Sequence, residues 1–360
     1  MKRTVLALSL AAGLAAAARA EMPAERMHQV VEVAPGVIAF VAPENVSGIP
    51  SGNVVAVIGD DGVLVVDSGR FPTLARRMIE EIRRRTDRPV RYLVHTHWHL
   101  DHIVGDGEFR KAYPDAVFVG TELTRRKMLE KQPGYLEGVG KRDAEIGDRI
   151  DAAIARGTFR DGTKISEEEK RYLAKQARDI RLEGEELEGA TIVAPSLTFE
   201  RELIVRLGKR EVRVLFLGKG NTGGDTVVHV PDAKVVVTGD LLVLPTPYGY
   251  GCHPSAWIGT LDALMGLGAT AIVPGHGPVQ KDWEYAKKLK AVLTALRTQV
   301  AAAVAEGATL EDTRKRVTLE DFRKSFAGED WERSRAFRDF FVADAVTRAY
   351  QEAKGEMAEE

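Results

Sequence analysis

The sequence predicts a layered α/β fold in which helices cover the faces of β-sheets. Residues 30–66 contain short apolar strands divided by turn signals such as Pro35-Gly36, a pattern typical of antiparallel hairpins. Strands and helices then alternate between residues 73 and 120, and the chain is rich in helical patterns from residue 282 to its end. Hairpins followed by such alternation indicate sheets with helices packed on them.

The first helix is defined by its apolar periodicity. Residues 73–86 carry an apolar stripe at helical spacing and arginines on the other face, which predicts an amphipathic helix. Two strands are expected to follow, at residues 90–94 and 116–119. Residues 42–53 are rich in Pro, Gly and Ser, and are either an ordinary connection or a flexible loop that lies over a functional site.

Residues 121–190 interrupt this alternation with a charged, helix-forming stretch that we interpret as an insertion. Within it, Ser166 followed by three glutamates is a helix-capping signal. Strands are expected to resume at residues 191–193, 203–207 and 212–217. Residues 254–267 then carry apolar side chains at helical spacing, which predicts a helix packed on the core.

Residues 281–360 are predicted to form a helical C-terminal extension. Residues 282–306 have the pattern of one long amphipathic helix, Thr318-x-x-Asp321 is a candidate cap for another, and residues 331–353 carry aromatic side chains at helical spacing. Such an extension could serve as a substrate lid or as a surface for oligomer formation. Without a further signal, we expect it only to pack on the domain.

The N-terminus, residues 1–20, has the composition of a cleavable secretory signal. Two basic residues precede an apolar stretch, residues 5–17, that is too short to span a bilayer stably, and Ala18-Arg19-Ala20 offers a cleavage site before Glu21. We therefore expect export to a bacterial periplasm or beyond, with no stable membrane anchor. The main domain then covers residues 21–280.

The charge and cysteine content exclude some classes of partner and of cross-link. The full chain has 51 basic and 53 acidic residues, and loss of Lys2, Arg3 and Arg19 with the signal leaves 48 basic residues. A slightly acidic chain has no excess of positive charge for nucleic acid, so a small-molecule substrate is expected. The one cysteine, Cys252, cannot form an internal disulfide.

Residues 95–102, His-Thr-His-Trp-His-Leu-Asp-His, carry the strongest functional signal. They hold four of the eight histidines and a carboxylate directly after an apolar strand, where side chains converge on one point. Imidazole and carboxylate together suit zinc, with iron or manganese as alternatives, and the absence of nearby cysteine argues against a structural zinc site. The segment therefore predicts an open, reactive metal centre.

The spacing of residues 97–102 resembles the HxHxDH signature of the metallo-β-lactamase superfamily. Further segments resemble motifs of that family in the same order: residues 62–69 with Asp67, residues 235–240, and residues 273–278. The resemblance covers roughly residues 30 to 280. It implies a four-layer αββα sandwich, here with a helical insertion and a helical C-terminal extension, in which the aspartate at position 67 braces the metal loop.

The resemblance also implies two metal positions. The first would take His97 and His99, the second Asp101, His102 and His276, and Asp240 would bridge them. Two metal ions a few ångströms apart hold a hydroxide between them, lower its pKa and polarise the bond that is cleaved. The family pattern therefore implies hydrolysis by a metal-bound hydroxide, with one or two zinc ions and Asp101 as the expected catalytic residue.

The sequence departs from the family pattern at residues 218–225, Gly-Lys-Gly-Asn-Thr-Gly-Gly-Asp. Asn221 stands where the GxGHT segment of the family has the third histidine of the first position. An amide oxygen is a poorer zinc ligand than imidazole, so the first position should bind metal more weakly. The outcome is an asymmetric metal pair, a single ion held mainly by Asp101, His102 and His276, or a degenerate site.

The loop that leaves Asp240, residues 245–254, should pass near the metals. Its candidates for substrate contact are Tyr248, Tyr250 and His253.

The sequence thus favours an exported zinc-dependent hydrolase that acts on an ester, lactone, thioester or amide bond. A β-lactam is included but less favoured, because many true β-lactamases have cysteine or serine at the position of Asp240. Two other classes stay open: an iron-dependent oxidoreductase on the same fold, like persulfide dioxygenases or flavodiiron proteins, and a non-catalytic binding or cofactor-relay protein with a degenerate site.

We predict that residues 1–20 are removed on export, because the charge pattern and the Ala-x-Ala site match what a signal peptidase recognises. N-terminal sequencing of the protein from the periplasmic fraction should begin at Glu21. An exported protein that keeps Met1 would contradict this prediction.

Overall fold

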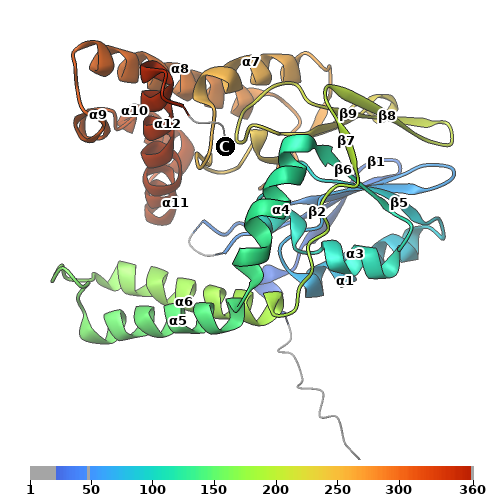
Figure 1. Ribbon diagram of the computed structural model, residues 1–360, viewed down its shortest axis with the longest axis horizontal. Helices are drawn as coiled ribbons and strands as arrows, with labels where there is room; N and C mark the ends of the chain where they lie inside the picture. Colours follow the sequence, from blue (N-terminus) through green and yellow to red (C-terminus); the bar gives the residue numbers. More distant parts are fainter. Residues whose placement is uncertain (1–21, 47–48, 358–360) are drawn as a thin grey trace, which may run out of the picture.

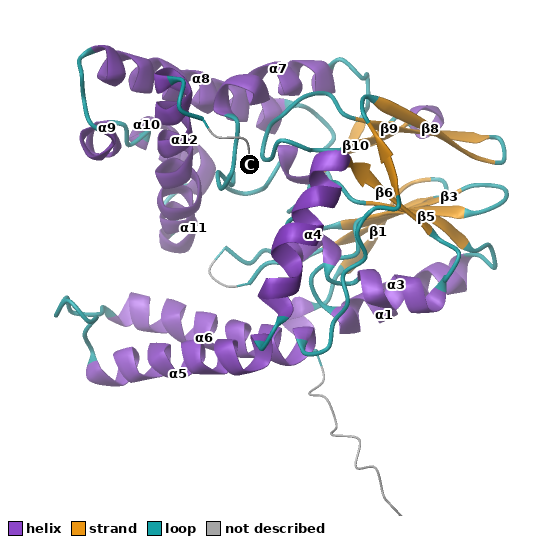
Figure 2. Ribbon diagram, in the orientation of Figure 1, coloured by secondary structure: helices purple, strands orange, loops and turns teal. Residues whose placement is uncertain are grey.

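The computed structural model describes residues 22–46 and 49–357, so the predicted signal segment and its cleavage site lie outside the described residues. Two β-sheets lie face to face, and helices cover their outer sides (Figures 1 and 2). This is the αββα arrangement that the sequence predicts. None of the described helices combines the length and the apolar character needed to cross a membrane.

The first sheet has the strand order β1-β2-β3-β4-β5-β6-β7. These strands are β1 (Gln29–Ala34), β2 (Val37–Val41), β3 (Val54–Ile58), β4 (Val63–Val66), β5 (Val90–Val94), β6 (Val117–Thr121) and β7 (Leu197–Phe199). Pairing is antiparallel from β1 to β4 and parallel from β4 to β7. The expected strand at residues 191–193 is wrong, because the backbone N–H of Val193 donates to the Asp106 carboxylate (3.1 Å) instead of to a ladder.

The second sheet has the order β12-β11-β10-β9-β8. These strands are β8 (Glu202–Leu207), β9 (Arg210–Leu215), β10 (Val227–Val230), β11 (Val235–Val237) and β12 (Ala271–Val273). Pairing is antiparallel from β8 to β11, and β12 joins β11 in parallel. The carboxyl ends of β11 and β12 therefore lie side by side.

The alternation of side chains along the strands produces the layers. In β2, Val37 and Ala39 face the apolar core between the two sheets, whereas Ile38 and Phe40 face the helices on the other side. The outer helices of the first sheet are α1 (Pro72–Arg85) and α3 (Asp106–Ala112), and those of the second are α7 (Pro254–Met265) and α8 (Glu284–Ala305). Each layer thus buries the apolar face of its neighbour.

The predicted insertion forms three helices, α4 (Glu122–Leu136), α5 (Val139–Arg156) and α6 (Glu167–Leu187). In Figure 1, α5 and α6 lie side by side as a hairpin that extends from the sandwich. The capping signal at Ser166 is confirmed: its side chain accepts from the backbone N–H of Glu169, and the Glu169 carboxylate accepts from the backbone N–H of Ser166.

After α8, the extension continues with short helices. These are α9 (Leu310–Arg316), α10 (Glu320–Ala327), α11 (Trp331–Ala336), a π-helical segment (Phe337–Val342) and α12 (Ala343–Lys354). The predicted cap at Thr318 is wrong, because Leu319 in the left-handed conformation (φ 51°) precedes α10. Buried side chains such as Phe337 and Phe341 join the core that covers the second sheet. The extension therefore packs on the domain, and its use in oligomer formation stays a prediction.

Candidate metal centre

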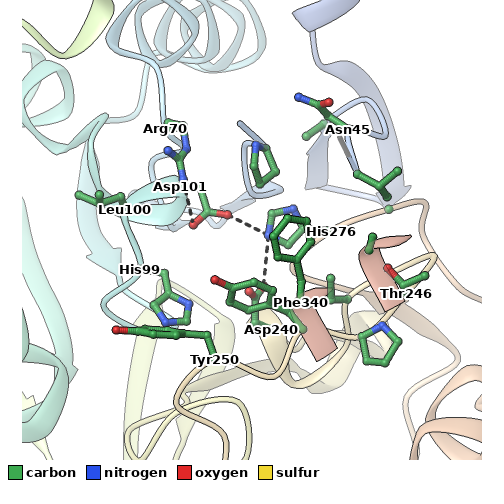
Figure 3. Close-up of a pocket in the computed structure, with 18 of the residues that line it drawn as sticks. Asn45, Arg70, His99, Leu100, Asp101, Asp240, Thr246, Tyr250, His276 and Phe340 are labelled. Carbon is green, nitrogen blue, oxygen red and sulfur yellow. Dashed lines mark ion pairs between the residues drawn. The ribbon is translucent and has the colours of Figure 1, made fainter. Parts of the chain in front are cut away.

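The predicted ligands meet at one edge of the sandwich, where strands of both sheets end. Residues 95–102 follow β5 and include the short helix α2 (Leu100–Ile103). Asp240 lies in a 3-10 helix (Gly239–Leu241) after β11, and His276 follows β12. Because neighbouring parallel strands end at the same edge, segments that are distant in the sequence converge there. Figure 3 shows Asp101, His276 and Asp240 directed toward one another.

Two overlapping groups of side chains are close enough to hold metal ions. One comprises Asp101, His102 and His276, the other His97, His102 and Asp240, and within each group the ligand atoms lie within 4.8 Å of one another. His276 Nε2 is 3.0 Å from Asp101 Oδ2, and His102 Nε2 is 3.2 Å from Asp240 Oδ1. The sequence placed His102 in the second position alone, whereas the geometry puts it within reach of both groups.

Four of the predicted ligands have protonation states that suit metal binding. Burial lowers the pKa of His99 to about 4 and that of His97 well below its usual value, so both imidazoles are neutral. Burial opposes the ionisation of Asp101 and Asp240, but the adjacent histidines outweigh it and hold the pKa of both carboxyls well below their usual range. Neutral imidazole and ionised carboxylate are the forms that bind metal ions. The exception is His102: burial alone would lower its pKa, but the carboxylates of Asp240 and Asp101 raise it well above its usual value, so a metal ion would displace its proton.

Four predicted ligand atoms are buried without a hydrogen-bond partner among the described residues: His97 Nε2, His99 Nε2, Asn221 Oδ1 and Asp240 Oδ1. Leaving one such atom unsatisfied costs about 1–3 kcal/mol, so several at one place need a reason. A metal ion is the partner that imidazole nitrogen and amide oxygen have in common. The residues present therefore fit a metal centre.

Asp67 fixes the loop that carries the ligands. Its carboxylate accepts hydrogen bonds from the backbone N–H (2.7 Å) and the hydroxyl (2.8 Å) of Thr96, and from Nδ1 of His102 (2.8 Å). The last contact leaves Nε2 of His102 free to face a metal. Asp67 adopts φ 61°, which a non-glycine residue rarely does. The bracing role implied by the family resemblance thus has a geometric basis.

Two glycines allow the backbone to approach the ligands closely. A Cβ at Gly52 would collide with the ring of His102, and one at Gly275 would collide with the Asp240 carboxylate. Both positions therefore require glycine as long as the ligand side chains keep their places.

Asn221 lies in the loop between β9 and β10. Its Nδ2 donates a hydrogen bond to the backbone carbonyl of Tyr248 (3.0 Å), so the amide joins this loop to the loop that follows Asp240. The carboxylate of Asp225 accepts from the backbone N–H and the hydroxyl of Thr222, which holds the turn in shape. The amide oxygen is thereby fixed in a buried position.

The candidate substrate residues divide into two kinds. Tyr248 and Tyr250 line a cavity of about 530 Å³ above the ligands, and their rings lie 5.8 and 6.0 Å from the ring of His99. His253 is not among the described residues that line it. It lies instead at the start of α7, where its backbone N–H donates to the carbonyl of Gly220 (2.8 Å).

The sequence interpretation missed several residues at the cavity. Arg70 lies with Nη2 3.9 Å from Asp101 Oδ1, Tyr135 of α4 contributes part of the lining, and Phe340 of the π-helical segment lies over the ligands in Figure 3. A signal for Arg70 was present, because it follows the strand-end turn at Asp67 directly. Tyr135 and Phe340 carry no local signal, because only tertiary packing brings the insertion and the extension to the site.

Comparison with known proteins agrees with this geometry. The sequence profile of the Metallo-beta-lactamase superfamily matches residues 48–276. The chain belongs to this superfamily. Among curated proteins of the family, a linear primary-alkylsulfatase from Pseudomonas sp. is 26% identical over 248 residues, which is 67% of this chain and 44% of that protein. The chain thus matches less than half the length of this relative.

Solved structures show the same fold. A metallo-beta-lactamase from Pontibacter korlensis superposes with a TM-score of 0.53 at 18% identity, covering 74% of this chain and 99% of that one. A stereoselective inverting sec-alkylsulfatase from Pseudomonas sp. superposes with a TM-score of 0.61 at 16% identity, covering 90% of this chain and 50% of that one. The relatives named in these comparisons are hydrolases.

We predict that His102→Ala loses most of its bound metal and its activity while the protein stays folded. Loss of a side chain that only supports a ligand costs roughly 10- to 100-fold in metal affinity, and His102 reaches both ligand groups, so the loss should be larger. Metal content per chain after dialysis is the measurement. His229→Ala, a buried histidine of β10, is the matched control and should keep its metal. Full metal occupancy in His102→Ala would refute the ligand assignment.

We predict that Asn221→His tightens the first metal position, because imidazole is a better zinc ligand than an amide oxygen. Competition with a chromogenic chelator should show a higher metal affinity or more metal per chain than in the wild type, and Asn221→Ala should show the opposite change. Turnover is the secondary readout, since a stronger ligand lowers the Lewis acidity of the ion it binds. Unchanged metal binding in both variants would show that Asn221 does not face the metals.

Proposed function

We propose that the protein is an exported, zinc-dependent hydrolase that cleaves an ester bond in a small molecule. The observation that carries the proposal is the buried set of ligand atoms, several without a hydrogen-bond partner among the described residues, at the floor of a cavity of about 530 Å³. A concave site with a few converging polar groups among apolar walls is where a protein binds and converts a small molecule. When bound, the metal ions supply Lewis-acid activation of water and of the bond to be cleaved.

The chain's own side chains orient the substrate. Tyr248 lines the cavity, and burial together with the charges of Asp101 and Asp344 raises the pKa of its phenol well above its usual value. The phenol therefore stays protonated and is able to donate a hydrogen bond to a substrate oxygen. Asp101 and Asp240 stay ionised, so their negative charges would hold the metal cations beside the substrate.

The walls of the cavity favour a substrate with an apolar part. They comprise Trp98 from the ligand loop, Tyr250 from the loop after Asp240, Leu100 from α2 and Phe340 from the extension. Burial of apolar surface in such a cavity contributes about 25 cal/mol per Å². Because the curated relative acts on linear primary alkyl sulfates, an ester of an apolar alcohol is the best-supported class for this chain.

Contacts between the segments added to the sandwich surround the cavity. The ring of Tyr172 in α6 lies 5.7 Å from that of Trp331 in α11, and Arg333 pairs with Glu44 of the 42–53 loop (2.7 Å). These contacts hold the insertion, the extension and the loop together around the cavity. Residues 42–46 and Pro50 also line it, which favours the expectation that this loop lies over the site.

The test is metal quantification combined with a hydrolysis panel. We expect one or two zinc ions per chain and hydrolysis of sulfate or carboxylate esters of apolar alcohols above lactone, thioester and β-lactam substrates. Phe340→Ala should raise KM for a long-chain ester more than for a short-chain ester, because it removes part of an apolar wall. Iron as the bound metal with no hydrolysis would favour an oxidoreductase, and a protein that binds no metal would refute the proposal.

A further inference from the structure

Arg70 lies at the metal centre without a role in the hydrolysis described above. It follows the turn after β4, lines the cavity and is about 11% exposed. In Figure 3 its guanidinium points toward Asp101. The separation of 3.9 Å between Nη2 and Asp101 Oδ1 exceeds hydrogen-bond distance, so the ion pair is incomplete. Asp101 also directs its other oxygen toward His276 (3.0 Å).

The insertion holds this arginine in place. The carboxylate of Glu183 in α6 accepts a hydrogen bond from Nη1 of Arg70, and the hydroxyl of Tyr135 in α4 donates to the same carboxylate (3.3 Å). The side chain of Glu183 is buried, with a relative exposure of 2%. One turn further, Glu186 accepts from the backbone N–H (3.0 Å) and the hydroxyl (2.7 Å) of Thr73 in α1. Two buried glutamates of α6 thus form hydrogen bonds with the segment that carries Arg70.

The guanidinium keeps donors that the described residues do not use. Nε is buried without a hydrogen-bond partner among them, and the carboxylate of Asp101 is too far from Nη2 to accept a hydrogen bond. An arginine side chain is not deprotonated in proteins, and the guanidinium of Arg70 is paired with the carboxylate of Glu183, so the side chain is a permanent cation. A fixed, cationic, planar donor at a cavity wall suits the oxygen atoms of an anion.

We propose that Arg70, held by Glu183 and Tyr135, is the specificity-determining residue of the cavity and binds a negatively charged oxygen of the substrate. The substrate class is an ester whose acid part keeps a negative charge, such as a sulfate or phosphate ester, and this deepens the proposed hydrolase function on which it rests. The insertion would then contribute to substrate specificity, because α4 and α6 supply both groups that position the arginine.

A second arginine that pairs with a carboxylate of α6 provides a matched control. Arg26 pairs with Asp179, one turn before Glu183 on α6, and donates from Nη1 to the carbonyl of Ile49. It is buried like Arg70 but does not line the cavity with the metal ligands. Arg26→Gln and Asp179→Asn therefore remove an equivalent buried ion pair without touching the proposed anion site.

The test measures binding of inorganic phosphate to the zinc-loaded protein by isothermal titration calorimetry, with zinc content determined for each variant. Arg70→Gln should weaken binding by roughly 10- to 100-fold, the loss expected for charge-assisted hydrogen bonds, with zinc content unchanged. Arg70→Lys should recover part of the affinity. If Arg70→Gln does not fold, Glu183→Gln against Asp179→Asn makes the same comparison, with weaker binding expected only in Glu183→Gln.

Kinetics with two esters of one alcohol separate this inference from the proposed function. Arg70→Gln should raise KM for 4-nitrophenyl sulfate and leave 4-nitrophenyl acetate almost unaffected. Equal phosphate affinity in the wild type and Arg70→Gln, or an equal loss in Arg26→Gln, would overturn the inference. If the wild type hydrolyses neither ester while phosphate binding still depends on Arg70, the proposed hydrolase function fails and the anion site stands.

Discussion

The hydrogen bonds to the carboxylate of Asp67 are the contacts on which the geometry of the site depends. They join the end of β4 to the loop after β5 through Thr96, and they set the ring orientation of His102. Because His102 reaches both ligand groups, an error in its orientation would affect both at once. The unusual backbone angle of Asp67 is tolerated because its carboxylate accepts three hydrogen bonds that hold the residue in place.

The sandwich supplies the ligands, whereas segments added to it shape the cavity. Strand ends of both sheets bring the histidines and carboxylates together, and this part follows from the topology of the superfamily fold. The insertion brings Tyr135 and Glu183 to the site, and the extension brings Phe340. The fold alone therefore does not determine the substrate, since the walls and the cation beside Asp101 depend on helices that lie outside the sandwich.

Local signals in the sequence predicted local features well and distant contacts poorly. The strands and turns of the first hairpins and the capping box at Ser166 depend on neighbouring residues, so their patterns were sufficient. The cap expected at Thr318 failed although its spacing was suitable, because Leu319 in a left-handed conformation starts the helix instead. The candidate ligands of residues 97–102 were recognisable from their spacing within one loop, whereas Asp240 and His276 were identified from the family resemblance. The pair of Arg70 and Glu183 was not, because 113 residues separate its members.

The two proposed metal positions are not equivalent in this chain. The second group, Asp101, His102 and His276, has the Arg70 cation near Asp101. The first group comprises His97, His102 and Asp240 without His99, and the further donor that the family resemblance implies there is the neutral amide of Asn221. An amide oxygen donates less charge than imidazole, so an ion in the first position would be bound more weakly and would be the stronger Lewis acid. The same amide donates from Nδ2 to the carbonyl of Tyr248 and so joins the first position to the substrate loop. We therefore expect Asn221 to couple metal affinity to the placement of the cavity wall, so that a change at this residue acts on both.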